Sequence, residues 1–447
     1  MQRPGRSVVA LALALGAACR GKASPAGGGG EAGIPLDAGG SAAAGGLSDD
    51  GGDAEAGRLS DDAGGAEAGV ALDAGDTAPA AGPVRLGMGR GGFCGIWADG
   101  SARCWGMTAP IPTRGEWRAR PTARSEGFMV GGVRATAVGL DHRCVLLEDG
   151  TVRDAVYRPV DNPCFVTYVR PLRGVEQLVA GAVVLCARFA TGEVSCWRDG
   201  YGDEVFPAEP APVPGLRDVV EVAAGDHHVC ARRSDGTVWC WGDNDVGQLG
   251  AGKYGTYQPE KGGWKGEARP LRVVGLGGAT HIALGFGHSC AIVSSGEVFC
   301  WGYNHEDQLG TGVKLDTSKF APISLPGEGI ALPETEEWVF ATSRDYPLKV
   351  AGLSVAVELA LGADLSCART SDGKVHCWGH LGPGPNRAIP APVPGLDGVV
   401  QIVSAPNVSL VCALRGSGEA LCWGANEFGV LGEEKRAFTR TPQPVRW

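Results

Sequence analysis

The sequence predicts an all-β protein folded as a seven-bladed β-propeller, and three observations support this prediction. Glycine makes up 73 of the 447 residues, about twice its usual share of ~7% in globular proteins. This composition favours closely spaced turns and excludes a helical bundle. Cysteines recur ten residues apart. The segments around them form seven similar units, each with room for about four short strands, which together fit a propeller.

Six cysteine pairs share one spacing and one glycine. In each pair a glycine stands six residues after the first cysteine. A three-residue loop that ends at Gly296 places Cys290 and Cys300 directly opposite one another, within disulfide range. The predicted bridges are Cys94–Cys104, Cys186–Cys196, Cys230–Cys240, Cys290–Cys300, Cys367–Cys377 and Cys412–Cys422.

A seventh unit has lost its second cysteine. The segment CVLLEDGTVRDAVY keeps Cys144 but has Asp154 in the partner position. Cys164 is then the other unassigned thiol apart from Cys19, so parity favours a Cys144–Cys164 bridge. Zinc ligation by the pairs is disfavoured because no two cysteines lie two to four residues apart. Paired cysteines also indicate an oxidising compartment.

The first 19 residues have the pattern of a secretory signal peptide. Arg3 and Arg6 precede a short apolar run that ends in small residues at Cys19. The run is shorter than a membrane span, and LGAAC is similar to a bacterial lipobox, although Gly16 holds the place where leucine is usual. We therefore expect lipidation at Cys19 and a stable anchor in the bacterial cell envelope through two or more acyl chains. Cleavage by the general signal peptidase is the alternative.

Residues 20–82 are predicted to be a disordered, acidic tether. They contain almost only glycine, alanine, aspartate, glutamate and serine, with LSDDGGDAEAG nearly repeated as LSDDAGGAEAG. Such a segment has too few apolar groups to offset the entropy lost on ordering. The propeller is assigned to residues 83–447. The formal net charge of −10 and the lack of a basic stripe exclude nucleic acid as a partner.

The repeat resembles the regulator of chromosome condensation repeat family. Its pattern, G-x-x-H-x-C, a glycine turn and C-W-G-x-N-x-x-G-Q-L-G, is clearest in GDHHVCARRSDGTVWCWGDNDVGQLG from Gly225. The resemblance implies a seven-bladed propeller, and the cysteine pairs are similar to those of the exported bacterial branch. The first unit lacks a proline-rich lead-in, whereas the chain ends with a spare one, TRTPQPVRW. We therefore expect the C-terminal strand to complete blade 1, so that pairing of the N- and C-terminal segments closes the ring.

Three sets of recurring residues are interpreted as structural. Residues repeated at one place in several blades are spread around the ring, which disfavours a shared metal or acid–base site. The histidines are expected to be packed and hydrogen-bonded, the tryptophans to pack blades together rather than to stack on a ligand, and the asparagines to cap turns. The sets are His142, His228 and His288; Trp105, Trp197, Trp241, Trp301, Trp378 and Trp423; and Asn244, Asn304 and Asn426.

Binding residues are sought where the repeats differ. Two insertions follow the same strand of neighbouring units and are expected on one face. Exposed aromatic residues beside cations are typical anchors for a protein or glycan. The alternative is that one or both segments only lengthen a strand pair or pack on the rim. The candidates are Lys253, Tyr254, Tyr257, Lys261, Trp264 and Lys265 in the first insertion, and Phe320, Trp338, Phe340 and Tyr346 in the second.

The predicted function is that of a binding module. A monomeric propeller, held at the envelope by its tether, would present loops to an unknown protein or polysaccharide. No catalytic motif stands out, so we expect no enzyme activity, cofactor or metal. The resemblance implies alternatives, since the nuclear family member promotes nucleotide exchange on a small GTPase and a secreted relative inhibits β-lactamases. Export disfavours exchange, whereas inhibition of a secreted or envelope enzyme, or a propeller hydrolase or lyase, stays open.

Overall fold

The structure is a computed structural model that describes residues 82–89, 92–107, 121–128, 132–139, 142–157, 165–170, 172–198, 205–258, 263–313, 323–324, 330–331, 343–426 and 438–445. The chain divides into two units, Met1–Thr77 and Ala78–Trp447, and all described residues lie in the second. The predicted signal peptide, the lipidation site Cys19 and the predicted tether before Gly82 lie outside the described residues.

Every regular element in the described part of the chain is a β-strand, and seven antiparallel sheets of four strands form the blades. Blade 1 contains β1 (Arg85–Gly89), β2 (Gly92–Ile96), β3 (Ala102–Met107) and β4 (Pro121–Phe128). Blade 2 contains β5 (Val133–Val138), β6 (His142–Leu147), β7 (Val152–Tyr157) and β8 (Phe165–Arg170). Blade 3 contains β9 (Val175–Ala180), β10 (Val184–Phe189), β11 (Val194–Arg198) and β12 (Ala211–Pro212).

The remaining blades repeat this order. Blade 4 contains β13 (Val219–Ala224), β14 (His228–Arg233), β15 (Val238–Gly242) and β18 (Glu267–Arg272). Blade 5 contains β19 (Ala279–Leu284), β20 (His288–Val293), β21 (Val298–Tyr303) and β24 (Ser343–Lys349). Blade 6 contains β25 (Ala356–Leu361), β26 (Leu365–Thr370), β27 (Val375–Gly379) and β28 (Arg387–Pro392). Blade 7 contains β29 (Val399–Ser404), β30 (Leu410–Arg415), β31 (Ala420–Ala425) and β32 (Phe438–Pro444).

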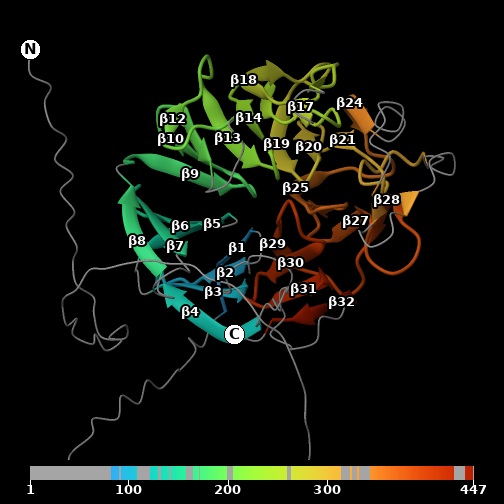
Figure 1. Cartoon of the computed structure of the whole chain (residues 1–447). Helices are drawn as coiled ribbons and strands as arrows, with labels where there is room; N and C mark the ends of the chain where they lie inside the picture. Colours follow the sequence, from blue (N-terminus) through green and yellow to red (C-terminus); the bar gives the residue numbers. More distant parts are fainter. Residues whose placement is uncertain are drawn as a thin grey trace, which may run out of the picture. The chain divides into compact units, whose positions relative to one another are not determined.

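The first strand of each blade lines the centre of the ring. These inner strands, β1, β5, β9, β13, β19, β25 and β29, each contact the inner strand of the next blade, and β29 contacts β1. Figure 1 shows the seven sheets arranged around this centre in chain order. The predicted seven-bladed propeller is therefore confirmed.

The hairpin between the second and third strands has the predicted register. Cys290 lies directly opposite Cys300, and Gly296 has the positive φ, 78°, that its place in the three-residue loop requires. All six predicted bridges are present, with Cα atoms 4.1 Å apart in each. In blade 2, Asp154 lies opposite the buried Cys144 in the strand register, as expected. Cys164 lies outside the described residues, so the Cys144–Cys164 bridge stays a prediction.

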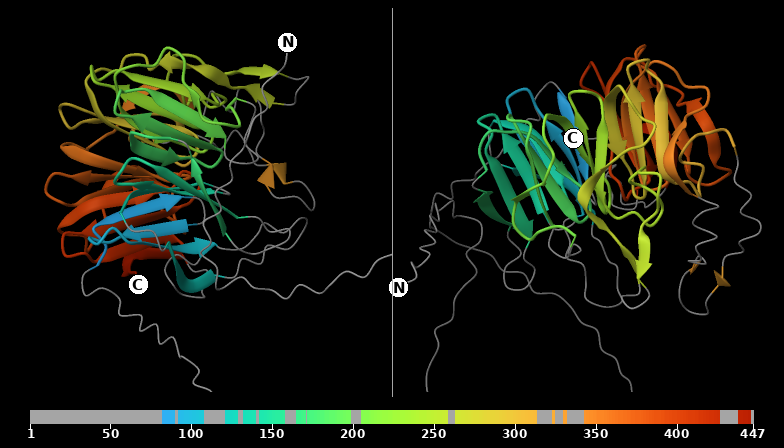
Figure 2. Two further views of the ribbon diagram at one scale, coloured as in Figure 1. Left: turned by 90° about the vertical axis from the view of Figure 1, so that its left-hand side faces the viewer. Right: turned by 90° about the horizontal axis from the view of Figure 1, so that it is seen from above.

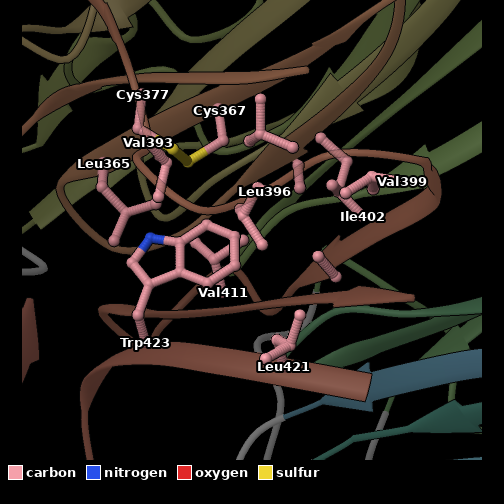
Figure 3. Packing of buried hydrophobic residues seen from close by; sticks show 13 residues of the cluster. Leu365, Cys367, Cys377, Val393, Leu396, Val399, Ile402, Val411, Leu421 and Trp423 are labelled. Atoms are coloured by element: carbon pink, nitrogen blue, oxygen red, sulfur yellow. A yellow bond between two sulfur atoms is a disulfide. The ribbon is translucent and has the colours of Figure 1, made fainter. Parts of the chain in front are cut away.

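Each boundary between blades has its own apolar core. In the core between blades 6 and 7, Trp423 of β31 reaches the preceding blade and packs near the Cys367–Cys377 bridge and Leu396 (Figure 3). The same pairing of one blade's disulfide with the next blade's tryptophan recurs at Trp378, Trp301 and Trp241. The tryptophans are therefore blade-packing residues, as predicted, although the side chain of Trp105 is not described.

The C-terminal strand lies in blade 7, so the prediction that it completes blade 1 was wrong. β32 pairs with β31, with Gln443 opposite Cys422. Each proline-rich segment forms the outer strand that ends a blade, as in β12 and β28. An outer strand tolerates proline because one of its edges is unpaired, so a missing N–H there costs no hydrogen bond. The spare segment at the chain end is thus the outer strand of the last blade.

Side-chain contacts close the ring between blades 7 and 1. The Gln401 amide donates to the Leu86 carbonyl at 3.0 Å and accepts from the Leu86 N–H at 2.8 Å. Leu86 and Phe93 of blade 1 also pack in one core with the Cys412–Cys422 bridge of blade 7. The two end blades therefore join without exchanging a strand.

Candidate binding face

One face of the ring carries the long connections, and we call it the loop face. It comprises the turns from first to second strand and the connections from third to fourth strand. Both insertions start here, and each contains a strand pair: β16 (Thr256–Gln258) with β17 (Gly263–Lys265), and β22 (Ile323–Ser324) with β23 (Ile330–Ala331). Figure 2 shows the two strand pairs projecting from the same side of the ring, as predicted. The opposite face, with the short turns from second to third strand, is the turn face.

Two predicted binding residues of the first insertion are part of its scaffold. The half-buried Tyr254 of blade 4 donates its hydroxyl hydrogen to the Ser343 carbonyl of blade 5 at 3.3 Å. Burial raises the pKa of this phenol. The Lys253 ammonium lies 2.8 Å from the Glu267 carboxylate at an exposed position. Tyr254 therefore fixes the insertion against blade 5, and Lys253 stays accessible to a partner.

The structure places the other candidates only in part. Tyr257 pairs in register with Trp264, and Thr256 with Lys265, in the β16–β17 hairpin. Tyr346 lies on β24 and is 46% exposed. Lys261, Phe320, Trp338 and Phe340 lie outside the described residues. The binding roles of all these side chains stay predictions.

The recurring histidines His228 and His288 are buried and hydrogen-bonded, as predicted, and they connect neighbouring blades. The Nε2 atoms of His228 and His288 lie 2.9 Å from the hydroxyls of Ser289 and Ser366 in the next blade. Each serine donates its own hydrogen to a backbone carbonyl, Gln248 or Gln308, so each histidine Nε2 is the donor to its serine. Burial lowers the pKa of both imidazoles to about 3. The side chain of His142 is not described.

The C-W-G-x-N-x-x-G-Q-L-G motif also forms scaffold. Asn304 accepts a hydrogen bond from the Leu309 N–H at 2.8 Å, and Asn244 accepts one from the Leu249 N–H at 3.1 Å. These caps hold a loop whose glutamine carbonyl receives the next blade's indole N–H, as between Trp378 and Gln308 at 2.8 Å. Asn426 is buried at the equivalent place. Since the motif residues bind one another, the variable positions are the candidates for partner binding.

In blades 4, 5 and 6, two variable positions face each other on the loop face. The residue before the second strand and the residue near the end of the third are joined by a backbone hydrogen bond. The pairs are His227 with Asp243 in blade 4 (3.0 Å), Gly287 with Tyr303 in blade 5 (2.8 Å) and Asp364 with His380 in blade 6 (2.8 Å). Blades 4 and 6 thus hold histidine and aspartate in exchanged order, on either side of a tyrosine.

A network of side chains extends from the blade 6 pair to blade 5. The His380 Nδ1 atom lies 3.1 Å from the Asn386 side-chain oxygen and 3.7 Å from the Glu306 carboxylate. The Asn386 amide also donates to Glu306. His305 Nε2 lies 3.8 Å from the same carboxylate, and its ring centroid is 6.2 Å from that of Tyr303. Glu306 is therefore held in place by neighbours from two blades.

The carboxylates around Tyr303 make this region strongly acidic. Burial, followed by the charges of Asp364, Glu306 and Asp245, raises the pKa of the Tyr303 phenol above its ordinary range. Burial and the charge of Glu306 also raise the pKa of Asp364, although His380 and His305 oppose this rise. These effects place Glu306 within electrostatic reach of Asp364, and all three carboxylates within electrostatic reach of the Tyr303 phenol.

An exposed aromatic residue lies beside these acids. Phe286, at the turn before β20, is 49% exposed, and its N–H donates to the Gly362 carbonyl at 3.2 Å, two residues before Asp364. A Cβ atom added to Gly287 would lie 3.3 Å from the Tyr303 Cβ, so the glycine lets Tyr303 pack against this turn. We call Asp245, Phe286, Tyr303, Glu306, Asp364 and His380 the acidic–aromatic cluster. Sequence reasoning missed it, although a comparison of equivalent positions between blades would have found its histidine and aspartate.

The centre of the ring is a second candidate site, with a depression of about 280 Å³ lined by the inner strands. Its polar side chains are engaged in joining blades. Glu221 lies 2.7 Å from Arg232 and 2.5 Å from His281, and Gln177 bonds both backbone groups of Val222 in the next blade. Burial alone would raise the pKa of Glu221, but His281 and Arg232 hold it below its ordinary value. These groups therefore stabilise the ring.

Searches for a metal site and for a membrane span were negative within the residues described. No group of three or more histidine, cysteine, aspartate or glutamate side chains there is arranged to hold a metal ion. No helix in that part is long and apolar enough to cross a membrane.

Sequence comparisons identify the repeat. A family model described as the regulator of chromosome condensation (RCC1) repeat matches residues 219–248 and 279–308, and a second model with this description matches residues 235–292. The chain contains RCC1 repeats. These matches fall in blades 4 and 5, which carry the most complete copies of the motif.

Individual RCC1 relatives support the same fold. The RCC1 domain-containing protein RUG3, mitochondrial, of Arabidopsis thaliana is 32% identical over 175 residues, 37% of this chain and 34% of RUG3. This chain thus spans about a third of the length of that relative. The structure is similar to yeast RCC1 (Prp20) in its complex with Kap60, with a TM-score of 0.59 and 18% identity over 82% of this chain and 85% of that one. A separate crystal structure of Prp20p from Saccharomyces cerevisiae gives a TM-score of 0.58 and 19% identity over 77% and 85% of the two chains.

Proposed function

We propose that this protein is an RCC1-type interaction module that binds a protein partner through the loop face of blades 4 to 6. The observation that carries the proposal is the acidic–aromatic cluster, which occupies positions where the repeats differ. The recurring histidines, tryptophans and asparagines are used within the ring, so they leave the variable positions as the site of specific recognition. The strand pairs β16–β17 and β22–β23 project from the same side of the ring (Figure 2).

A protein partner is favoured over a polysaccharide by two considerations. The yeast RCC1 (Prp20) structure, which shares this fold, was determined with the protein Kap60 bound. The exposed Phe286 beside charged groups also fits the mixed apolar and polar character of a protein interface. A polysaccharide partner remains the alternative outcome of the test.

The test is site-specific photo-crosslinking in cells that express the protein. A photoreactive amino acid replaces Phe286 on the loop face or, as a control, the exposed Asp397 at a turn on the opposite side. We expect a discrete, protease-sensitive adduct from position 286 and none from position 397. A protease-resistant adduct that glycosidases digest would replace the protein by a polysaccharide. Equal labelling at both positions, or none at either, would reject the loop face as the binding surface.

We also propose that the chain is exported and held at a bacterial envelope through Cys19, and the amino-terminal pattern described above supports this. Cys19→Ser is expected to remove acyl-chain incorporation in a metabolic labelling experiment and to shift the protein from the membrane fraction to the soluble fraction. A Cys19→Ser variant that still incorporates fatty acid and stays in the membrane fraction would reject this anchor.

A further inference from the structure

We propose that the acidic–aromatic cluster binds a lysine or arginine side chain from a basic segment of the partner. This inference rests on the proposed function and adds the chemistry of the partner to it. Three features of the cluster support it: its carboxylates lack a basic counterion from the described chain, an aromatic ring lies open beside them, and a rigid network holds them.

Several glutamates elsewhere in the ring are paired with a guanidinium or an ammonium group. Examples are Glu358 with Arg369 at 2.7 Å, Glu176 with Arg188 at 2.9 Å and Glu419 with Arg415 at 2.6 Å. Among the residues that the structure describes, no lysine or arginine forms an ion pair with Asp245, Glu306 or Asp364; Glu306 is paired only with His305 and His380. The cluster therefore combines several negative charges without the lysine or arginine that pairs with these glutamates.

The placement of Asp364 and Glu306 favours a shared cation. The two carboxylates repel each other, which contributes to the raised pKa of Asp364. A guanidinium group accepted between them would relieve this repulsion and form charge-assisted hydrogen bonds. Because both acids are partly buried, such a bond is less screened by salt than a bond between fully exposed groups.

The aromatic residues suit the rest of a basic side chain. Lysine and arginine carry an apolar stem that packs on apolar surface while the charged end reaches a polar group. Phe286 offers an exposed ring whose turn is hydrogen-bonded to the turn that holds Asp364, and a cation over such a ring gains a further attraction. A basic side chain bound at Asp364 would thus lie beside the turn that carries Phe286.

The network around His380 makes the site preformed. Asn386 connects His380 to Glu306 across the boundary of blades 5 and 6, so the carboxylate does not need to be ordered when a ligand arrives. Preorganisation lowers the entropic cost of binding. The net charge of −10 also favours the approach of a basic partner.

The experiment measures binding of two fluorescein-labelled octapeptides, (Gly-Arg)4 and (Gly-Glu)4, to the full-length protein by fluorescence anisotropy at low salt. We expect the protein to bind (Gly-Arg)4 and not (Gly-Glu)4. The double variant Glu306→Gln, Asp364→Asn keeps the side-chain shapes and removes two charges, and we expect it to raise the Kd for (Gly-Arg)4 by about tenfold. The matched control, Glu148→Gln with Asp397→Asn, removes two exposed charges away from the loop face and is expected to raise the Kd by less than about twofold.

A second variant keeps the test valid if the double variant folds poorly. Phe286→Ala changes an exposed side chain and is expected to raise the Kd for (Gly-Arg)4 by about two- to fivefold without changing the thermal midpoint. If the site and control variants weaken binding equally, the attraction is a property of the net charge and the inference is wrong. It is also wrong if neither the double variant nor Phe286→Ala weakens binding.

The result also separates this inference from the proposed function. One outcome is a partner adduct at position 286 together with a Kd for (Gly-Arg)4 that the cluster variants do not change. This outcome would reject the basic ligand and keep the loop face as the binding surface. The absence of both the adduct and cluster-dependent peptide binding would reject both. Cluster-dependent binding of (Gly-Arg)4 supports the inference.

Discussion

The two faces of the ring are built from the same strands, but their acidic side chains have different neighbours. On the turn face, the acids at the hairpin turns bond the turn itself, as when Asp235 accepts the Thr237 N–H at 2.9 Å and Asp372 lies 3.0 Å from the Lys374 ammonium. On the loop face, Asp364 and Glu306 have histidines and a tyrosine as neighbours. The turn face therefore uses its acids for stability, whereas the loop face keeps carboxylates that, in our proposal, an external ligand would bind.

The largest expected effect comes from breaking the scaffold that supports both faces. Trp301→Ala is expected to lower the free energy of unfolding by about 3 to 5 kcal/mol, because the indole is fully buried between blades 4 and 5 and donates to the Gln248 carbonyl at 2.9 Å. Urea unfolding followed by fluorescence measures this loss. Phe286→Ala on the loop face is expected to change it by less than about 1 kcal/mol. Comparable losses from both variants would contradict the division between scaffold and binding face.

Acidification tests the same scaffold without a mutation. His228 and His288 have a pKa of about 3 in the folded ring, against 6.5 in the unfolded chain. Between these values the unfolded chain binds more protons, so their stabilising contribution is complete above about pH 6.5 and is lost progressively as the pH falls toward 3. Each buried histidine accounts for about 1.4 kcal/mol per pH unit in this range, and the two together for about 3. Calorimetry between pH 7.5 and 5 checks this, and a thermal midpoint that does not fall would contradict the neutral buried imidazoles.

Removing one hairpin bridge has a smaller expected effect. The double variant Cys290→Ser, Cys300→Ser is expected to cost about 2 kcal/mol, less than the full loop-entropy value because the unfolded hairpin is already compact. Blade 2 offers a natural comparison, since Asp154 replaces the second cysteine of its hairpin. Denaturant unfolding of the purified variant gives the loss. An unchanged midpoint would show that the bridges do not stabilise the blades.

The smallest expected effect is on the thermal midpoint when one aspartate on each face is replaced by asparagine. The shift is expected to have opposite signs on the two faces. Asp372 on the turn face has its pKa lowered to about 2, chiefly by a hydrogen bond from Thr370 and a second one from Lys374, so Asp372→Asn is expected to lower the thermal midpoint at pH 7. This contribution is present above the unfolded pKa of 3.8 and is lost as the pH falls through about 2. Asp364 has its pKa raised by burial and Glu306, so Asp364→Asn is expected to raise the midpoint. Two shifts of the same sign would show that the faces do not differ in this way.

Much of the fold follows from the sequence because each hairpin is a local unit. The ten-residue cysteine spacing fixes the register, and the positive φ at Gly296 follows from the turn length. The assignment of the last strand was wrong because a proline-rich segment between two blades looks the same whether it ends one blade or begins the next. Only the pairing of β32 with β31 decides this.

The candidate site was less predictable because its parts are far apart in the chain. Glu306 and Asp364 are ordinary loop residues when read one at a time, and the packing of blades 5 and 6 brings them together. The residues predicted to bind were instead aromatic residues beside lysines in the first insertion. One of them, Tyr254, joins two blades. The aromatic and basic residue types of the first insertion suggested binding. The position of a residue within the repeat is a better guide, because it indicates which side chains do not form contacts within the ring.

The boundary between blades 7 and 1 gives the ring a mechanical weak point. The blades follow one another in chain order, and within the residues that the structure describes no segment runs from blade 7 into blade 1. That boundary depends on Gln401, Leu86 and the apolar side chains around the Cys412–Cys422 bridge. Tension that pulls Gly82 away from Val445 acts on these contacts first. Under load, the circle should open there into a curved ribbon of intact, disulfide-bonded sheets before any blade unravels.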